Sequence, residues 1–175
     1  MHRGIFMEEV SLQEMLAARE RRSALQTRLL QQYKKSLISF TLNIPGPVKV
    51  PDGVPQAFAT GCRRIEALLK DRLVLVQHME TIKEKTGYEA FYCIDANPEF
   101  IKTLMVTLED QDRLGRLFDI DVIRPDGSKV SREELGRPSR TCLLCKEPAH
   151  ACSRSRRHSV AELTAEIGHI LKDLY

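Results

Sequence analysis

Apolar side chains recur at helical spacing in three parts of the chain. Residues 8–35 and 55–71 carry apolar positions three and four residues apart, and the last stretch does so after Ser159. Ser11 and Ser159 each stand three residues before a glutamate. This is the capping-box pattern, in which the serine and glutamate side chains satisfy free N–H groups of the first helical turn. We therefore predict helices over 8–35 and 55–71 and a final helix after Ser159.

Other apolar stretches alternate with polar residues or run without interruption, as strands do. These stretches are residues 37–44, 73–78, 88–94, 105–108 and 115–123. Lys85-Thr86-Gly87 indicates a turn between paired strands, and Pro98 suits the first turn of a short helix. Residues 131–158 show little periodicity. The pattern predicts an α+β fold, a mixed sheet flanked by helices, as one domain over 1–175 in which 1–10 is an extension.

The composition is that of an ordinary folded protein. Of the 175 residues, 42% are hydrophobic and 29% charged, which argues against disorder. No apolar run approaches the roughly 20 residues that cross a bilayer, and the first nine residues become acidic too early for a signal peptide. We therefore expect a cytoplasmic protein without a membrane partner. The five cysteines are an odd number, and in a reducing compartment they favour metal binding or packing over disulfides.

The net charge of +3 hides an uneven distribution. Between Arg113 and Arg157 there are nine arginines and two lysines against six acidic residues, a net charge of +5. This segment is more basic than the whole chain, so the remainder is slightly acidic. Such a basic segment indicates an anionic partner, for example one that carries phosphate.

Two acidic residues lie inside this basic segment. Asp119 and Asp121 belong to the expected strand 115–123, so their side chains share one face, with Cα atoms about 6.5–7 Å apart. Carboxylates on a buried strand are costly unless they are paired or bind metal, and Mg²⁺ is typically held by one or two carboxylates plus substrate phosphates. The alternative is a solvated strand face. Phosphatases of the haloacid dehalogenase type also use D-x-D, but near the start of a large α/β domain, whereas only 54 residues follow Asp121.

Basic and glycine-containing segments supply candidate phosphate contacts. Arg19, Arg22 and Gln26 fall on one face of the first predicted helix, where arginine forks match phosphate oxygens. The loop Pro45-Gly46-Pro47-Val48-Lys49 offers close backbone approach at Gly46 and one cation at Lys49. The alternatives are an ordinary solvated helix face and an ordinary loop.

A cysteine cluster offers a second candidate metal site. Its pattern is C-x2-C-x6-C-x5-H, made by Cys142, Cys145, Cys152 and His158. Three thiolates and an imidazole at such spacings can form a tetrahedral zinc site. The last two ligands are loosely spaced and the knuckle encloses two leucines, so we prefer packed thiols over a zinc site at this point. Cys62 and Cys93 lie in apolar surroundings and are expected in the core, and His150 is a spare candidate ligand.

Four groups of residues, in order, together resemble one protein family. They are Arg19-Glu20-Arg21-Arg22 with Gln26; Ser39-Phe40-Thr41 with Pro45-Gly46-Pro47-Val48-Lys49; Gly115-Arg116-Leu117-Phe118-Asp119-Ile120-Asp121-Val122; and Cys142-Leu143-Leu144-Cys145 with Cys152-Ser153-Arg154 and His158. Over residues 11–174 the chain resembles holo-citrate lyase synthase, the apo-citrate lyase phosphoribosyl-dephospho-CoA transferase family. The family tends to have His-Pro before Leu114-Gly115, where this chain has Asp112-Arg113, so a histidine role there is not carried over.

The resemblance implies a nucleotidyltransferase-like fold and reaction. The enzyme would take 2′-(5″-triphosphoribosyl)-3′-dephospho-CoA and join it through a phosphodiester to a serine of the citrate lyase acyl carrier (gamma) subunit, releasing pyrophosphate. Asp119 and Asp121 would hold Mg²⁺, with Glu109 as a third acid. The cations that would neutralise the triphosphate are Arg19, Arg22, Lys49 and Arg116, with Arg154 and His158 as further candidates.

Two other functions stay open. The first is the same transfer to the carrier of malonate decarboxylase. The second is a non-enzymatic, basic zinc-knuckle adaptor that binds nucleic acid. The adaptor would account for the basic segment, but it leaves the paired acids unexplained, and they would repel a phosphate backbone without a metal. The sequence also lacks the aromatic clusters expected for base stacking, so no nucleic-acid partner is predicted.

Overall fold

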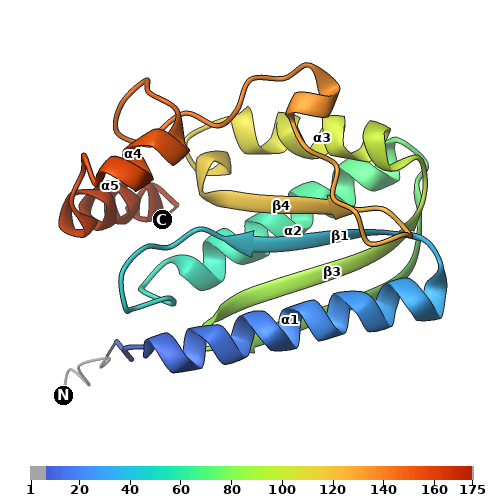
Figure 1. Ribbon diagram of the computed structural model, residues 1–175, viewed down its shortest axis with the longest axis horizontal. Helices are drawn as coiled ribbons and strands as arrows, with labels where there is room; N and C mark the ends of the chain where they lie inside the picture. The colour runs from blue at the N-terminus through green and yellow to red at the C-terminus, as the bar shows by residue number, and fades with distance from the viewer. Residues whose placement is uncertain (1–6, 175) are drawn as a thin grey trace.

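The fold is a four-stranded sheet with helices on both faces and at one end (Figure 1). The computed structural model describes residues 7–174. The elements are α1 (Leu12–Tyr33), β1 (Ser36–Leu42), α2 (Val54–Asp71), β2 (Leu75–Glu84), β3 (Gly87–Asp95), α3 (Pro98–Asp110), β4 (Phe118–Ile123), α4 (Ala149–Ser155) and α5 (Val160–Lys172), with 3₁₀ turns at Gly115–Leu117 and Glu133–Leu135. None of the helices in this range is long and apolar enough to cross a membrane.

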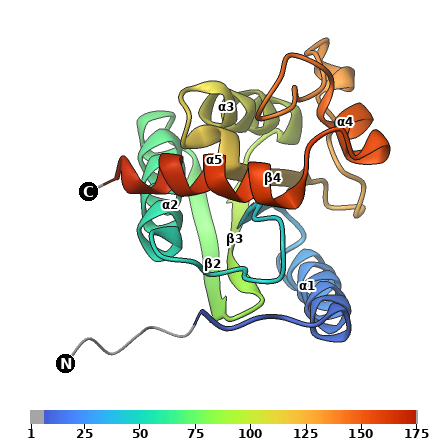
Figure 2. The same cartoon turned by 90° about the vertical axis from the view of Figure 1, so that its left-hand side faces the viewer.

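The sheet has the strand order β2-β3-β1-β4, and all three pairings are antiparallel. The α+β class is confirmed, and the sheet, expected to be mixed, is antiparallel throughout. Helix α1 covers one face, and α2 and α3 cover the other (Figure 1). Helix α5 runs across one end of the sheet, beside the loop that follows β1 (Figure 2).

The helix starts follow from the capping residues. The Ser11 hydroxyl accepts a 3.1 Å hydrogen bond from the Glu14 N–H, and the Glu14 carboxylate accepts one of 2.8 Å from the Ser11 N–H. Ser159 and Glu162 repeat both bonds at the start of α5. Both predicted capping boxes are therefore confirmed. Val10, the last residue of the expected N-terminal extension, is buried and donates to the Pro47 carbonyl, whereas residues 1–6 lie outside the described range.

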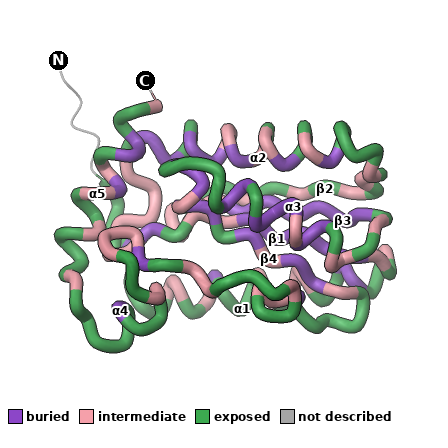
Figure 3. The backbone as a smooth tube through the Cα atoms, turned by 90° about the horizontal axis from the view of Figure 1, so that it is seen from above, coloured by how far each residue is buried: buried purple, intermediate pink, exposed green. Residues whose placement is uncertain are grey.

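The two faces of the sheet carry cores of different size. On the α2 and α3 side, alternate strand residues join most of the buried side chains of the protein. On the α1 side, a smaller cluster lies under the C-terminal half of α1; its members are Leu29, Leu30, Leu37, Phe91, Cys93 and Ile123. Figure 3 shows this contrast, with β1, β3 and β4 mostly buried, the edge strand β2 intermediate or exposed, and α1 mostly exposed. The expected core position of Cys93 is confirmed, and Cys62 on α2 is partly buried against the main core.

Three predicted elements need correction. Residues 105–108 are not a strand, because α3 runs through them from its Asn97 cap and Pro98 start. A four-residue apolar window cannot separate the two structures, whereas the buried positions over the whole of α3 have helical spacing. Strand β2 runs from Leu75 to Glu84 and is longer than the strand expected over 73–78. Its side chains alternate between partly buried and exposed, as on an edge strand, so its second half has no apolar run that marks it in the sequence. The strand expected over 115–123 begins only at Phe118, after a 3₁₀ turn.

Candidate functional site

A row of polar side chains crosses the sheet on its α1 face. In the strand register Thr41 of β1 lies between Glu89 of β3 and Asp119 of β4. Facing residues of antiparallel strands share one face, so these three side chains lie side by side toward α1. Under the N-terminal half of α1 this face of the sheet is therefore polar, whereas under the C-terminal half it carries the apolar cluster.

Helix α1 brings basic side chains over this row. The Arg22 Nε donates a 2.8 Å hydrogen bond to Glu89 Oε1, and the Gln26 amide donates one of 3.0 Å to Ser39 Oγ. Arg19 lies about one turn before Arg22 and makes no ion pair or hydrogen bond with any residue in the described range. The predicted common face of the three side chains is therefore turned toward the sheet.

These residues enclose a small polar hollow. Its volume is about 140 Å³, and its lining includes Arg19, Arg22, Lys49, Glu89 and Asp119. The structure thus brings the predicted acid of β4 and the predicted cations of α1 and of the loop after β1 into one place. We call this space the polar hollow.

Asp119 is the unpaired acid of the polar hollow. Solvent reaches its carboxylate, which has no hydrogen-bond or salt-bridge partner among residues 7–174. Surrounding protein atoms partly desolvate it. This desolvation, followed by the charge of Asp121, raises the pKa of Asp119, and the Arg140 guanidinium opposes the rise. A desolvated acid without a fixed partner is suited to bind a cation.

Asp121 has a different environment from Asp119. Its carboxylate accepts a 2.8 Å hydrogen bond from the Lys129 ammonium, and it does not line the polar hollow. The two aspartates share a strand face as predicted, but only Asp119 is open toward α1. Asp121 therefore acts on Asp119 through its negative charge, which Lys129 partly neutralises.

The loop 45–49 contributes one of its two candidate residues. Lys49 lines the polar hollow and donates a 2.7 Å hydrogen bond to the Ile44 carbonyl, while burial and then the charge of Arg19 lower its pKa. Gly46 is in the left-handed region (φ +81°) and packs against α5, where an added Cβ would lie 3.3 Å from Val160 Cγ1. The need for glycine at position 46 therefore comes from the turn and from helix packing.

Three further candidates do not line the polar hollow. Glu109 is buried, forms an ion pair with Arg132 and accepts a 2.9 Å hydrogen bond from the Ile120 N–H, so both of its oxygens are occupied. The Arg116 guanidinium donates to the Thr141 carbonyl at 2.6 Å. Arg154 is exposed on α4 and lines neither the polar hollow nor the larger cavity described below. Besides desolvation, the charge of Glu109 contributes to the raised pKa of Asp119, but both Glu109 oxygens are already engaged by Ile120 and Arg132, which gives this residue a structural contact at β4.

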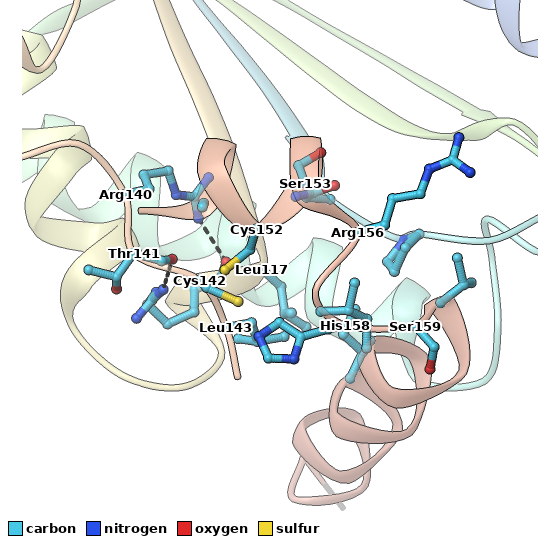
Figure 4. Close-up of a pocket in the computed structure, with 17 residues that line it drawn as sticks. Leu117, Arg140, Thr141, Cys142, Leu143, Cys152, Ser153, Arg156, His158 and Ser159 are labelled. Carbon is cyan, nitrogen blue, oxygen red and sulfur yellow. Dashed lines mark hydrogen bonds between the residues drawn. The ribbon is translucent and has the colours of Figure 1, made fainter. Parts of the chain in front are cut away.

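A second, larger cavity of about 640 Å³ lies next to the polar hollow. It is enclosed by the chain around Arg140, by α4 and by the first turns of α5, and most of its surface is apolar. Figure 4 shows Cys142, Cys152 and His158 close together in its wall, with Arg156 extending away from them. Asn43 lines both spaces, so the two are neighbours. We call this space the large cavity.

The cysteine cluster assembles as a possible metal site. One ligand atom from each of Cys142, Cys145, Cys152 and His158 lies within 4.8 Å of all the others. Cys145 Sγ is 3.4 Å from both Cys152 Sγ and His158 Nε2. Zinc–sulfur bonds of about 2.3 Å place tetrahedral ligands a little under 4 Å apart, so the set is compatible with zinc. From the sequence we preferred packed thiols, and that preference did not anticipate that the four ligand atoms would converge. His150, the spare candidate ligand, is not a member of the set.

The thiols of the cluster titrate differently. Burial raises the pKa of Cys152 to about 12, helped by the neighbouring Cys145 and Cys142 thiols. Burial acts in the same direction on Cys142, but hydrogen bonds from the Leu144 and Cys145 N–H groups and from the neighbouring thiols together lower the pKa of that thiol. All five cysteines are free thiols.

Sequence reasoning missed two residues at the boundary of the two spaces. Arg140 donates to the Arg116 carbonyl at 2.7 Å, lines the large cavity and is close enough to Asp119 to influence its pKa. Asn43 stands where β1 leaves the sheet and donates its N–H to the Leu117 carbonyl. Arg140 lies in the basic segment but belongs to no periodic pattern, and Asn43 falls inside the strand expected over 37–44, so neither carried a local signal of a binding site.

Comparison with known proteins finds a family model and several similar proteins that carry the same description. A family model described as "Apo-citrate lyase phosphoribosyl-dephospho-CoA transferase" matches residues 10–174. A protein of Vibrio cholerae named probable apo-citrate lyase phosphoribosyl-dephospho-CoA transferase is 39% identical over 94% of this chain and 93% of its own length. A Streptococcus pyogenes protein with the same name is 36% identical over 96% and 88%, respectively. A Citrobacter koseri apo-citrate lyase phosphoribosyl-dephospho-CoA transferase is 34% identical over 94% and 90%.

Proposed function

Because the chain belongs to the apo-citrate lyase phosphoribosyl-dephospho-CoA transferase family, a family of enzymes, we propose the reaction that it catalyses. It transfers the prosthetic group of 2′-(5″-triphosphoribosyl)-3′-dephospho-CoA to a serine of the citrate lyase acyl carrier subunit. The serine oxygen forms a bond to the phosphorus next to the ribose, the bond to the pyrophosphate oxygen breaks, and the serine proton passes to a base. One observation carries the proposal: an unpaired carboxylate, Asp119, shares a hollow with Arg19, Arg22 and Lys49.

The cations of the polar hollow bind the triphosphate. Arg19 has no acidic partner in the described range, and Lys49 donates only to a backbone carbonyl, so both charges are available to phosphate oxygens. Arg22 is partly neutralised by Glu89, which orients its guanidinium. Positioning and charge stabilisation account for most of the catalysis of phosphoryl transfers, and pyrophosphate is a leaving group on which such cations act directly.

Asp119 and Asp121 fit a magnesium ion of the usual type. Mg²⁺ is commonly held by one or two carboxylates together with substrate phosphates. Asp119 is free to bind directly, and Asp121, which also pairs with Lys129, supports it through its charge. A bound Mg²⁺ supplies neutralisation of the phosphoryl oxygens. Arg140 adds a further cation at the boundary with the large cavity.

Zinc is the proposed metal of the cysteine cluster, in a structural role. Cys142, Cys145, Cys152 and His158 would supply four ligands, the number that a closed structural zinc site uses. The ligands span residues 142–158, a segment with few regular elements, which the metal would hold against α5. Five cysteines without a disulfide are typical of a reducing compartment, so we propose that the enzyme, with its single transferase domain, acts in the cytoplasm.

The reaction is tested by intact-mass measurement of two apo carriers incubated in parallel with the triphosphoribosyl precursor, Mg²⁺ and the protein. We expect the citrate lyase carrier to gain the mass of one phosphoribosyl-dephospho-CoA group, with release of one pyrophosphate. Modification of the malonate decarboxylase carrier alone would replace the proposal with its closest alternative. No mass gain on either carrier with active reagents would reject the transferase activity.

A further inference from the structure

We infer that the large cavity binds the dephospho-CoA half of the substrate while the polar hollow binds its triphosphate end. The inference rests on the proposed function and adds the orientation of the substrate. The polar hollow, at about 140 Å³, is well below the 300–1,000 Å³ usual for small-molecule sites. A triphosphate linked to dephospho-CoA must therefore extend beyond it, and the large cavity, at about 640 Å³, is the adjoining space.

The two spaces meet at the reacting centre. Asn43 lines both of them. Arg140 lines the large cavity, and its charge reaches Asp119, which lines the polar hollow. A substrate that spans the boundary would place the phosphate next to its ribose between Asp119 and Arg140. The two outer phosphates would then lie among Arg19, Arg22 and Lys49, where pyrophosphate leaves.

The walls of the large cavity match the chemistry of dephospho-CoA. Beyond its adenosine, to which the phosphoribosyl group is joined, the molecule carries a diphosphate followed by a flexible, largely aliphatic arm. The inner walls are apolar and include Leu117, Leu143, Leu163 and Ile167. Among the described residues that line the cavity, His158 carries the only aromatic ring, and the apolar walls are otherwise aliphatic, which suits the aliphatic arm.

Three arginines line the same cavity and can meet the diphosphate. Arg116 and Arg140 each donate one hydrogen bond to a backbone carbonyl, shown as dashed lines in Figure 4, which fixes their guanidinium groups and leaves other N–H donors free. Arg156 has no hydrogen-bond or salt-bridge partner in the described range. Guanidinium forks match pairs of phosphate oxygens, so a diphosphate is the anion that this arrangement fits.

The test is isothermal titration of the full-length, zinc-loaded protein with dephospho-CoA and with pyrophosphate in the presence of Mg²⁺, each alone and then each in the presence of the other. We expect both ligands to bind at the same time. Arg156→Gln and Val160→Glu should each weaken dephospho-CoA binding at least about fivefold and leave pyrophosphate binding unchanged. Arg19→Gln should have the opposite effect.

The variants are chosen so that folding does not obscure the result. Val160 is 54% exposed and begins α5, where an acidic residue is favourable for the helix. Arg157→Gln, the matched control, removes the same charge one residue away from Arg156 at a position outside the cavity lining, and it should bind both ligands normally. Zinc content and the circular dichroism spectrum should be the same for all variants.

Three results would overturn the inference: mutual exclusion of the two ligands, no binding of dephospho-CoA, or equal effects of Arg156→Gln and Arg157→Gln. These results do not depend on the carrier. Two-site binding without carrier modification would reject the proposed function and keep the subsite assignment. Carrier modification combined with unaltered dephospho-CoA binding in Arg156→Gln and Val160→Glu would keep the function and reject the subsite.

Discussion

Asp119 and Asp121 are equivalent in the sequence pattern and different in the structure. Both point from the same face of β4, but Lys129 pairs with Asp121, whereas Asp119 opens into the polar hollow. The periodicity of a strand predicts the shared face. It cannot predict which acid receives a partner, because Lys129 reaches Asp121 only after the chain has turned back beyond β4.

The difference between the two aspartates predicts unequal losses of transferase activity. Asp119→Asn should lower kcat/KM by at least about 100-fold, the scale for removing one preorganised electrostatic group. Asp121→Asn should lower it only about tenfold, the scale for an outer-shell partner of a metal ligand. Rates of carrier modification at saturating Mg²⁺ measure both effects. Equal losses, or a larger loss in Asp121→Asn, would contradict the assignment of Asp119 as the principal ligand.

The raised pKa of Asp119 predicts that replacing this acid lowers activity but raises the stability of the metal-free protein at neutral pH. A carboxyl whose pKa is higher in the folded than in the unfolded state stabilises the fold at low pH, and this contribution is lost as pH rises through the folded-state pKa. Ionised Asp119 therefore destabilises the metal-free protein at neutral pH. Asp119→Asn should melt above the wild type at pH 7, with no difference at a pH below the pKa of an unfolded aspartate. A lower melting temperature of the variant at pH 7 would contradict the desolvation of this carboxylate.

At the scale of elements, the passage from α3 to β4 positions Asp119. The 3₁₀ turn that begins at Gly115 packs directly on the end of α3, where an added Cβ would lie 2.2 Å from the Leu108 carbonyl oxygen. Glu109 and Arg132 fix the same region, because the Glu109 carboxylate holds the Ile120 N–H and pairs with Arg132. Glu109, expected at the metal, thus acts on the strand that carries Asp119.

Gly115→Ala should destabilise the protein by about 1–3 kcal/mol, the usual cost of overpacking, because the contact is with backbone and no rotamer change relieves it. Gly168→Ala is the matched control. It adds a methyl group in α5 where nothing lies within 4 Å, and it should be neutral or stabilise the helix by up to about 1 kcal/mol. Urea unfolding measures both. Equal stability of the two variants would show that the turn does not pack on α3 as described.

The cysteine cluster predicts a metal-dependent element. Elemental analysis should find about one zinc per chain, and Cys145→Ser should lose most of it, whereas Cys62→Ala, a thiol outside the cluster, should keep it. Structural zinc supplies about 10–16 kcal/mol in small zinc-finger peptides. If only about 3 kcal/mol of this appears here, chelation should lower Tm by about 6–12 °C. The zinc site would be rejected if the metal-free protein kept its Tm and if its 142–158 segment resisted protease as well as in the untreated protein.

Elements with a strong local signal could be predicted from the sequence. The two capping boxes marked the starts of α1 and α5, and the apolar strand β1 stood out from its loop. The helix start at Pro98 is confirmed, but the C-terminal half of α3 was predicted as a strand, because a short apolar window suits both structures. Strand β2 was predicted, but with the wrong bounds, because an edge strand alternates polar residues. The cysteine pattern showed which residues could meet, but not that they do, since two loops and α4 bring them together.

At the scale of the whole molecule, the site depends on contacts between distant segments. Arg19 comes from the first helix, Lys49 from the loop after β1, Asp119 from the last strand and Arg140 from the irregular segment beyond it. Their motifs predicted phosphate and metal chemistry separately. The strand order, which places β1 between β3 and β4, is what brings the cations and the acid to one hollow, and no local pattern encodes it.

We propose that the phosphoribosyl-dephospho-CoA group is transferred to the citrate lyase carrier in the polar hollow. The most direct measurement is the intact mass of the apo carrier after a single turnover with the wild-type chain and, in parallel, with Asp119→Asn. We expect the wild type to add one prosthetic group per pyrophosphate released, and the variant to leave the carrier unmodified over the same time. An unmodified carrier with the wild type, or equal modification by both proteins, would contradict this proposal.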